Sequence, residues 1–185
     1  DVQAVNVFGK EDSISTIQVD FNLPERFDIT FVNEKGENER PFVIHRALIG
    51  SFERFFSFLI EHHGGDFPVW LAPVQVKILP IADRHNEYAR QVFEQLMDQD
   101  VRVEIDDRSE RLQAKIRAAE LARVPLMLII GDSEIEANKV GMRVRGKARE
   151  RAEEMIKNGE LKAELSQSGD LGAQDLSLLE MFLKK

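Results

Sequence analysis

The feature that most constrains the fold is a change in hydrophobic period near residue 50. Before it, polar and apolar residues alternate: in "STIQVDFN", residues 15–22, Ile17, Val19 and Phe21 share one face of an expected strand. After it, the apolar residues of "FERFFSFLI", residues 52–60, follow the i, i+3, i+4, i+7 spacing of a core-facing helix. The chain therefore begins with β-structure and changes to helix at this point.

The residues before the helix are typical of an antiparallel meander. The polar segment "NEKGEN", residues 33–38, predicts a hairpin turn. Two histidines followed by two glycines, residues 62–65, predict the end of the helix. Further strands are expected in residues 2–8, 26–32 and 40–47.

The second part of the chain alternates strand-like and helix-like segments. It follows a proline-bounded linker, so we place a domain boundary near Ala72, which gives domains 1–72 and 73–185. The unbroken apolar run "PLMLII" is expected in a strand covered on both faces, and the whole pattern predicts a compact α/β domain with a mixed, mainly parallel sheet. Strands are expected at 74–81, 101–105, 125–130 and 139–145, and helices at 84–98, 109–123, 147–158 and 171–184.

The composition excludes several classes of protein. The chain has no cysteine, which excludes disulfides and thiolate zinc sites within it and favours a reducing, cytoplasmic setting. The formal net charge is -8, so RNA binding would need a local basic patch. No apolar run is long enough to cross a bilayer and no signal peptide opens the chain, so we expect no membrane partner.

Four polar residues of the first domain allow two interpretations. Thr16 and Gln18 share the polar face of a strand, which meets either a ligand or water. Ser51 and Arg54 lie in the first turn of the expected helix. A helix N-terminus with an arginine suits an anionic phosphate, although solvated residues are also common there.

The histidines also leave alternatives open. His45 shares a strand face with Val43 and is either a metal ligand or a structural residue. For His62 and His63 we expect a solvated helix end, because neighbouring residues on a helix point about 100° apart and chelate one ion poorly.

The basic residues of the second domain are interleaved with acidic ones. Surface ion pairing and nucleic-acid binding therefore explain them about equally well. No glycine-rich phosphate loop and no serine or cysteine nucleophile motif is present. The basic residues are Arg108, Arg111, Lys115, Arg117, Arg143 and Arg145.

Long, ordered motifs of the chain resemble the C-terminal part of threonyl-tRNA synthetases. These are "STIQVDFNLPERFDI", "RPFVIHRALIGSFERF", "EHHGGDFPVWLAPVQVKILPI", "DDRSERLQAKIRAAELARVPLMLIIGDSE" and "VGMRVRG". The resemblance implies part of the antiparallel catalytic sheet of a class II synthetase, with "ALIGSFERF" as its third signature motif, followed by an α/β anticodon-binding domain. It also implies ATP-dependent formation of a threonyl-adenylate and transfer of threonine to tRNA(Thr).

The resemblance implies roles for the polar residues of the first domain. Zinc is an expected cofactor, because a metal that binds the threonine hydroxyl rejects valine. His45 would be one zinc ligand, and a cysteine and a histidine outside this chain would be the other two. ATP with magnesium is an expected substrate, and Arg54 is the expected catalytic residue at its phosphates. The expected ATP-binding residues are Thr16, Ser51, Arg54 and Ser13, which stands where the family has a glutamine, and Gln18 is expected to bind threonine or the adenylate.

In the second domain, the resemblance implies a site for anticodon bases at Ser109, Arg117, Glu134 and Arg143. Ser109 occupies a position where family members often carry asparagine. Hydrogen bonds from such side chains to exposed base edges are the usual way in which single-stranded RNA loops are read.

Three hypotheses about function follow. In the first, the chain is a fragment of a threonine–tRNA ligase that is a homodimer at full length, and it is inactive alone because the first two class motifs are missing. In the second, it is a non-catalytic truncated paralogue that binds tRNA. In the third, it is one half of a split synthetase.

Overall fold

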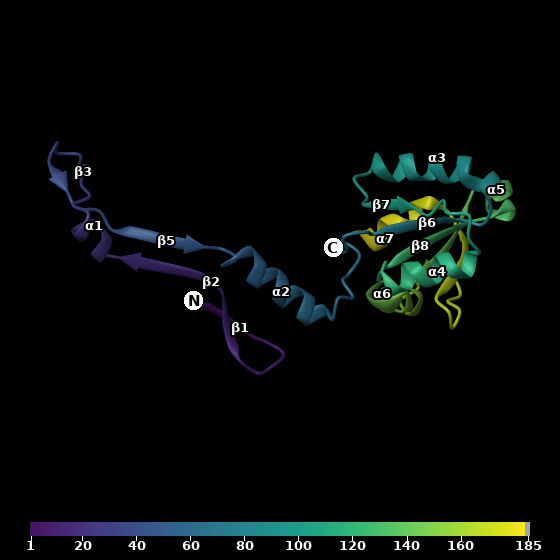
Figure 1. Cartoon of the computed structure of the whole chain (residues 1–185), viewed down its shortest axis with the longest axis horizontal. Helices are drawn as coiled ribbons and strands as arrows, with labels where there is room; N and C mark the ends of the chain where they lie inside the picture. Colours follow the sequence, from purple (N-terminus) through teal and green to yellow (C-terminus); the bar gives the residue numbers. More distant parts are fainter. Residues whose placement is uncertain (184–185) are drawn as a thin grey trace. The chain divides into compact units, whose positions relative to one another are not determined.

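The computed structural model of the chain describes residues 1–183, which form two compact units, the first from Asp1 to Gly65 and the second from Asp66 onwards (Figure 1). Residues 66–72 belong to the second unit, where the Arg102 guanidinium donates to the carbonyl oxygens of Trp70 and Ala72 at 2.8 and 3.0 Å. The boundary near Ala72 stays a prediction, and these hydrogen bonds attach the preceding linker to the second unit.

The first unit contains a three-stranded antiparallel sheet with strand order β1-β2-β5, as the alternation predicts. A separate two-stranded hairpin, β3-β4, surrounds the predicted turn, where the Asn33 side chain accepts the N–H groups of Lys35 and Glu37 at 3.0 Å. The elements are β1 (Val2–Val5), β2 (Glu11–Asp20), α1 (Asn22–Arg26), β3 (Phe31–Val32), β4 (Asn38–Glu39), β5 (Val43–Ala47) and α2 (Phe52–His63).

The strand predicted over residues 26–32 is wrong for most of its length. Helix α1 ends at Arg26, and only Phe31–Val32 forms a strand. Just upstream, the Asp20 carboxylate accepts the N–H groups of Asn22 and Leu23 at 2.8 and 3.0 Å and so stabilises the helical turn that reaches Arg26. Alternation in "RFDITFV" did not reveal this local capping.

Helix α2 has the predicted limits. The Ser51 hydroxyl accepts the N–H of Arg54 at 3.2 Å and caps its start, and Gly64 ends it with a left-handed φ of 57°. The helix was predicted to face a core, but none of its residues is buried in the described chain, and Phe52 is 68% exposed. Its apolar stripe therefore lacks a covering layer among residues 1–183.

The second unit contains a five-stranded sheet with strand order β10-β9-β8-β6-β7. Strands β7 and β8 pair with β6 in parallel, whereas β9 is antiparallel to both β8 and β10. All strands except β9 thus run in one direction, which confirms a mixed, mainly parallel sheet. The strands are β6 (Val76–Pro80), β7 (Val103–Ile105), β8 (Leu126–Ile130), β9 (Val140–Val144) and β10 (Asp170–Gln174).

Helices α3 and α4 lie on opposite faces of this sheet (Figure 1). On one face, Val92 and Leu96 of α3 join Val76, Ile78 and other strand residues in the larger core cluster. On the other face, Ile116 and Ala119 of α4 contact Leu79 and Met127. The helices are η1 (Asp83–His85), α3 (Asn86–Met97), α4 (Leu112–Leu121), α5 (Asp132–Ala137), α6 (Gly146–Lys157), η2 (Leu176–Leu178) and α7 (Leu179–Leu183).

Two parts of the second unit differ from the prediction. The helix predicted over 171–184 is a strand, β10, at its start, because Gly172 and its neighbours pair with β9, and helix α7 begins only at Leu179. Helix α5 was not predicted; it is short, and the Glu134 carboxylate accepts the N–H of Gly131 at 2.9 Å across its first turn. No helix formed by residues 1–183 is long and apolar enough to span a bilayer.

Candidate functional site

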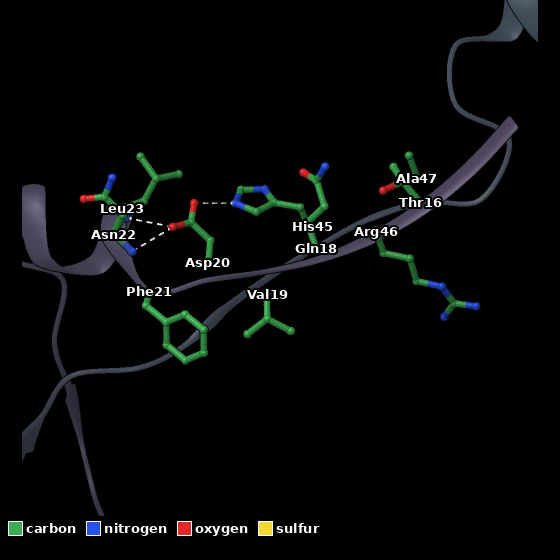
Figure 2. A pocket seen from close by; sticks show the side chains of 10 residues that line it. All are labelled: Thr16, Gln18, Val19, Asp20, Phe21, Asn22, Leu23, His45, Arg46 and Ala47. Atoms are coloured by element: carbon green, nitrogen blue, oxygen red, sulfur yellow. Dashed lines mark hydrogen bonds and ion pairs between the residues drawn. The ribbon is translucent and has the colours of Figure 1, made fainter. Parts of the chain in front are cut away.

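The first unit has a polar sheet face made by β2 and β5. Their register places Gln18 directly opposite His45 and Thr16 opposite Ala47. These side chains and Asp20 lie on one side of the strand pair, whereas Val19, Phe21 and Arg46 lie on the other (Figure 2). Residues from both sides of the strand pair line an open pocket of about 900 Å³. The strand alternation is therefore confirmed for Thr16 and Gln18.

His45 has a carboxylate partner on this face. Its Nε2 lies 3.0 Å from Oδ2 of Asp20. The hydrogen bond from the backbone N–H of Leu23, more than that from His45, lowers the pKa of Asp20 below its ordinary value, so this carboxylate is ionised and orients the imidazole. Asp20 was not singled out from the sequence, although alternation places it on the same face as Gln18.

The residues of this chain do not complete a zinc site by themselves. A structural or catalytic zinc needs at least three protein ligands, and residues 1–183 contain no group of three histidine or acidic side chains that could hold a metal. His45 supplies one candidate donor, and Asp20 bonds its ring. Because Nε2 is bonded to Asp20, Nδ1 is the ring nitrogen left to coordinate a metal.

The predicted ATP-binding residues lie on two segments. The Thr16 hydroxyl donates to Asp1, and the Ser13 hydroxyl accepts from the Gln3 amide at 2.9 Å. The backbone before α2 passes close by, since a Cβ at Gly50 would lie 3.7 Å from the carbonyl oxygen of Ser13. Ser51 and Arg54 follow at the start of α2, where the Ser51 hydroxyl serves as helix cap and Arg54 is exposed.

In the second unit, Arg143 and Arg117 are associated with the sheet face that α4 covers. Arg143 lies opposite Met127 in the β8–β9 register, and its Nη2 is 3.2 Å from the Glu120 carboxylate of α4. Its Nε is 3.8 Å from Asp170, and the side chain is only 16% exposed. Arg117, which is exposed, lies one helical turn before Glu120.

Glu134 lies beside the same part of the sheet. Its Oε2 accepts the N–H of Gly131, and its Oε1 is 3.7 Å from the position that a Cβ of Gly141 would take. Gly141 shares its strand face with Arg143, two residues further along. The structure therefore places Glu134 and Arg143 at one sheet face and Arg117 on the helix that covers part of that face.

Ser109 lies apart, in the exposed loop between β7 and α4. The Arg108 guanidinium donates to both oxygens of the buried Asp106 carboxylate at 2.8 and 2.7 Å and holds the start of this loop. These hydrogen bonds lower the pKa of Asp106. The loop that carries Ser109 is thus anchored by the ion pair of Asp106 with Arg108, a residue for which the sequence left ion pairing and nucleic-acid binding open.

Three of the six basic residues named from the sequence, Arg108, Arg143 and Arg145, form ion pairs. Arg145 pairs with Asp66 at 3.2 Å. Lys115 is buried, and its Nζ donates to the carbonyl oxygen of Pro80 at 2.9 Å. Its spacing from Leu112 and Ala119 places it on the apolar face of α4, a signal in the sequence that could have revealed its burial.

Comparisons with known proteins first define the class. The family model for the anticodon binding domain matches residues 75–168, slightly more than half of the chain. The model for the class II core domain of the tRNA synthetases for G, H, P, S and T matches residues 1–63. The chain therefore carries part of a class II synthetase core followed by an anticodon-binding domain.

Individual relatives define the family more closely. The chain is 54% identical over 160 residues to a threonine–tRNA ligase of Deinococcus radiodurans and 51% identical over 145 residues to one of Aquifex aeolicus. These alignments cover 86% and 78% of this chain. The RNA-binding domain of a threonyl-tRNA synthetase from Cryptosporidium parvum Iowa II matches with a TM-score of 0.68 and 34% identity, over 78% of this chain and 37% of that one.

The chain belongs to the threonyl-tRNA synthetase family. It spans about a quarter of the length of the curated relatives that it matches, 25% and 23% for the two ligases named above.

Proposed function

We propose that this chain acts in a threonine–tRNA ligase, which activates threonine with ATP and transfers it to tRNA(Thr). One observation carries the proposal: about half of the residues are identical to those of threonine–tRNA ligases over alignments that include most of the chain. The chain contributes residues to adenylate formation from its first unit and reads the anticodon with its second.

The second unit supplies the RNA-reading side chains. Arg117, Glu134 and Arg143 combine two guanidinium donors with a carboxylate acceptor at one sheet face and the helix that covers part of it, which supports hydrogen bonding to base edges. Ser109 contributes from the loop that Asp106 and Arg108 anchor. The overall charge of -8 favours a reader that selects bases over one that binds RNA by charge alone.

The first unit supplies part of the activation site. Arg54 offsets negative charge on the ATP phosphates, and Thr16, Ser13 and Ser51 bind the nucleotide, with magnesium as its counter-ion. Gln18 binds threonine or its adenylate from the face opposite His45. The exposure of Arg54 and the open pocket beside Gln18 and His45 support these roles, because both leave room for a ligand.

His45 is the one zinc ligand that we propose for this chain. His45 supplies one imidazole, oriented by Asp20, and residues outside this chain supply the remaining ligands. When bound, the metal supplies a Lewis acid that recognises the threonine hydroxyl. We further propose a homodimeric enzyme that works in the cytoplasm. The 185-residue chain alone is expected to show no threonine-dependent ATP–pyrophosphate exchange.

A second candidate is a non-catalytic tRNA-binding protein. One observation favours it: only the second unit has a buried core within residues 1–183, whereas the nucleotide and metal residues lie on an exposed, incomplete face. Anticodon reading is common to both candidates, and the activation residues of the first unit are useful only to the ligase.

Selection from total tRNA tests the shared step. The immobilised chain is incubated with a total tRNA pool, and the retained tRNA is sequenced. We expect threonine isoacceptors to be enriched over other tRNAs of similar abundance, and the enrichment to fall for Arg143→Ala. Retention in proportion to abundance would contradict the proposal.

A further inference from the structure

Helix α5, which carries Glu134, is too short to hold its position without contacts to other elements. It has six residues, none of them buried, and its Ile135 reaches the larger core cluster as a partly buried side chain. Isolated helices shorter than roughly 12 residues are marginal in water, so a helix of this length depends on its neighbours. The direction of the Glu134 carboxylate therefore depends on what holds α5.

Residues 81–88, which lead into α3, hold the start of α5 (Figure 1). The Asp132 carboxylate, in the first turn of α5, accepts from Nε of Arg84 at 2.9 Å and from Nη2 of the same guanidinium. It also lies 3.0 Å from Nε2 of His85, whose ring is buried. Because Nδ1 of His85 accepts the N–H of Ala82 at 3.1 Å, Nε2 carries the proton and donates it to Asp132.

The same segment contacts α5 and its flanks at two further points. The Tyr88 hydroxyl donates to the carbonyl oxygen of Lys139, just after the end of α5, at 3.1 Å. At Gly131, a Cβ would lie 2.8 Å from Cδ1 of Ile81 and 3.0 Å from Oε2 of Glu134, so both side chains lie against this glycine. One short segment thus contacts both ends of α5 and the residue whose N–H the Glu134 carboxylate accepts.

We infer that Asp132 and Tyr88 are positioning residues of the RNA-reading site: their hydrogen bonds fix the two ends of α5 and so orient the carboxylate of Glu134. The inference rests on the proposed anticodon reading, in which Glu134 accepts a hydrogen bond from a base. A hydrogen bond weakens steeply when its angle departs from linearity, so a small rotation of α5 reduces base discrimination. Contacts to phosphates, which other residues make, are unaffected by such a rotation.

The test compares the unchanged chain with Asp132→Ala and Tyr88→Phe, one variant for each end of α5. Glu136→Ala, at an exposed position of the same helix, is the control. Each chain is titrated with threonine tRNA and with a variant tRNA whose second and third anticodon bases are changed, and discrimination is the ratio of the two Kd values. For the unchanged chain we expect at least about tenfold discrimination. In Asp132→Ala and Tyr88→Phe we expect it to be about threefold lower, with binding of the changed tRNA within about twofold of the original. Glu136→Ala should keep full discrimination.

Combination with Glu134→Gln separates positioning from a general structural role. Glu134→Gln should itself lower discrimination. In that background neither Asp132→Ala nor Tyr88→Phe should cause a further loss of discrimination, because no carboxylate is left to orient. Any lowering of the melting temperature by Asp132→Ala should be the same in both backgrounds. Circular dichroism establishes that each variant is folded at the temperature of the titration.

The outcomes for the inference and for the proposed function are distinguishable. Full discrimination in a folded variant of either residue would overturn the positioning role of that residue and leave the proposed function intact. An equal further loss in the Glu134→Gln background would also overturn it, because the residue would then act without Glu134, and so would an equal loss in Glu136→Ala. If Asp132→Ala does not fold, Tyr88→Phe decides. If the unchanged chain itself does not discriminate, the proposed function fails, and the inference fails with it.

Discussion

The two units of the chain differ in how much of their apolar surface they bury. Among residues 1–65, all of which the structure describes, Pro24 is the one buried residue. The second unit buries two clusters, one on each face of its sheet. Both units nevertheless form regular, well-paired strands. Backbone pairing alone therefore does not produce a core, and only the second unit has the tertiary contacts that stabilise a fold.

The candidate sites of the two units differ in the same way, in how much of the surrounding structure holds their side chains. In the first unit, Thr16, Gln18 and His45 lie on a two-strand face whose reverse side exposes Val19 and Ile44. In the second, Glu134 and Arg143 are held by neighbours on three elements, which are α4, α5 and β10. A pre-organised site follows from a packed scaffold, so we expect base reading to survive in this chain and adenylate chemistry to be absent from it.

The largest expected effect is on the free energy of unfolding, and it compares a buried position of the second unit with an exposed position of the first. Leu128→Ala, at a fully buried position of β8, should lower the free energy of unfolding by roughly 2–5 kcal/mol, because it leaves a cavity in the core. Ile44→Ala, at a position 65% exposed in β5, should change it by about 0.5 kcal/mol or less. Urea denaturation followed by circular dichroism measures both. Equal losses would show that the first unit has a core after all.

A smaller effect is expected at the loop that carries Ser109. Asp106→Asn weakens the paired hydrogen bonds from Arg108 and should cost roughly 1–3 kcal/mol of stability, because the carboxylate is buried. Base discrimination should fall as the loop loosens. Asp107→Asn, on the exposed neighbour, is the matched control and should behave like the unchanged chain in both measurements.

The smallest expected effect depends on pH. The Arg84 guanidinium, with His85 as second donor, lowers the pKa of Asp132 well below 3.8. The stabilisation by this pair is complete above the unfolded pKa and is lost as pH falls through the folded value. Asp132→Asn should therefore melt at a lower temperature than the unchanged chain at pH 7, and the gap should narrow steadily as the pH falls below about 4. Asp83→Asn should melt like the unchanged chain throughout; a gap that is independent of pH would contradict the assignment.

The sequence predicts most strand and helix positions of the second unit, because its apolar residues are either continuous, as in 125–130, or spaced for a helix, as in α3. The sequence pattern misplaces elements where hydrogen bonds from a capping side chain determine where a helix begins. Asp20 caps the start of α1, which lies between two segments that alternate like strands, and Glu134 caps the short α5. The pairing of Gly172 with β9 depends on a partner strand distant in sequence, which periodicity cannot reveal.

For the candidate sites, too, the sequence predicts some features and not others. Alternation alone places Thr16 and Gln18 on one face, and the structure agrees. By contrast, the pairing of His45 with Asp20 and the approach of Glu134 to Gly141 depend on contacts between elements. The roles proposed for Thr16, Gln18, His45 and Glu134 come from the family resemblance.

The central claim is that the second unit reads anticodon bases, and a binding titration at two salt concentrations tests it most directly. Threonine tRNA is compared with a variant changed at the second and third anticodon bases. We predict a loss of roughly 1–3 kcal/mol on changing the bases, retained at both salt concentrations. Equal and weak binding to both tRNAs that falls steeply with salt would contradict the claim and leave only charge attraction.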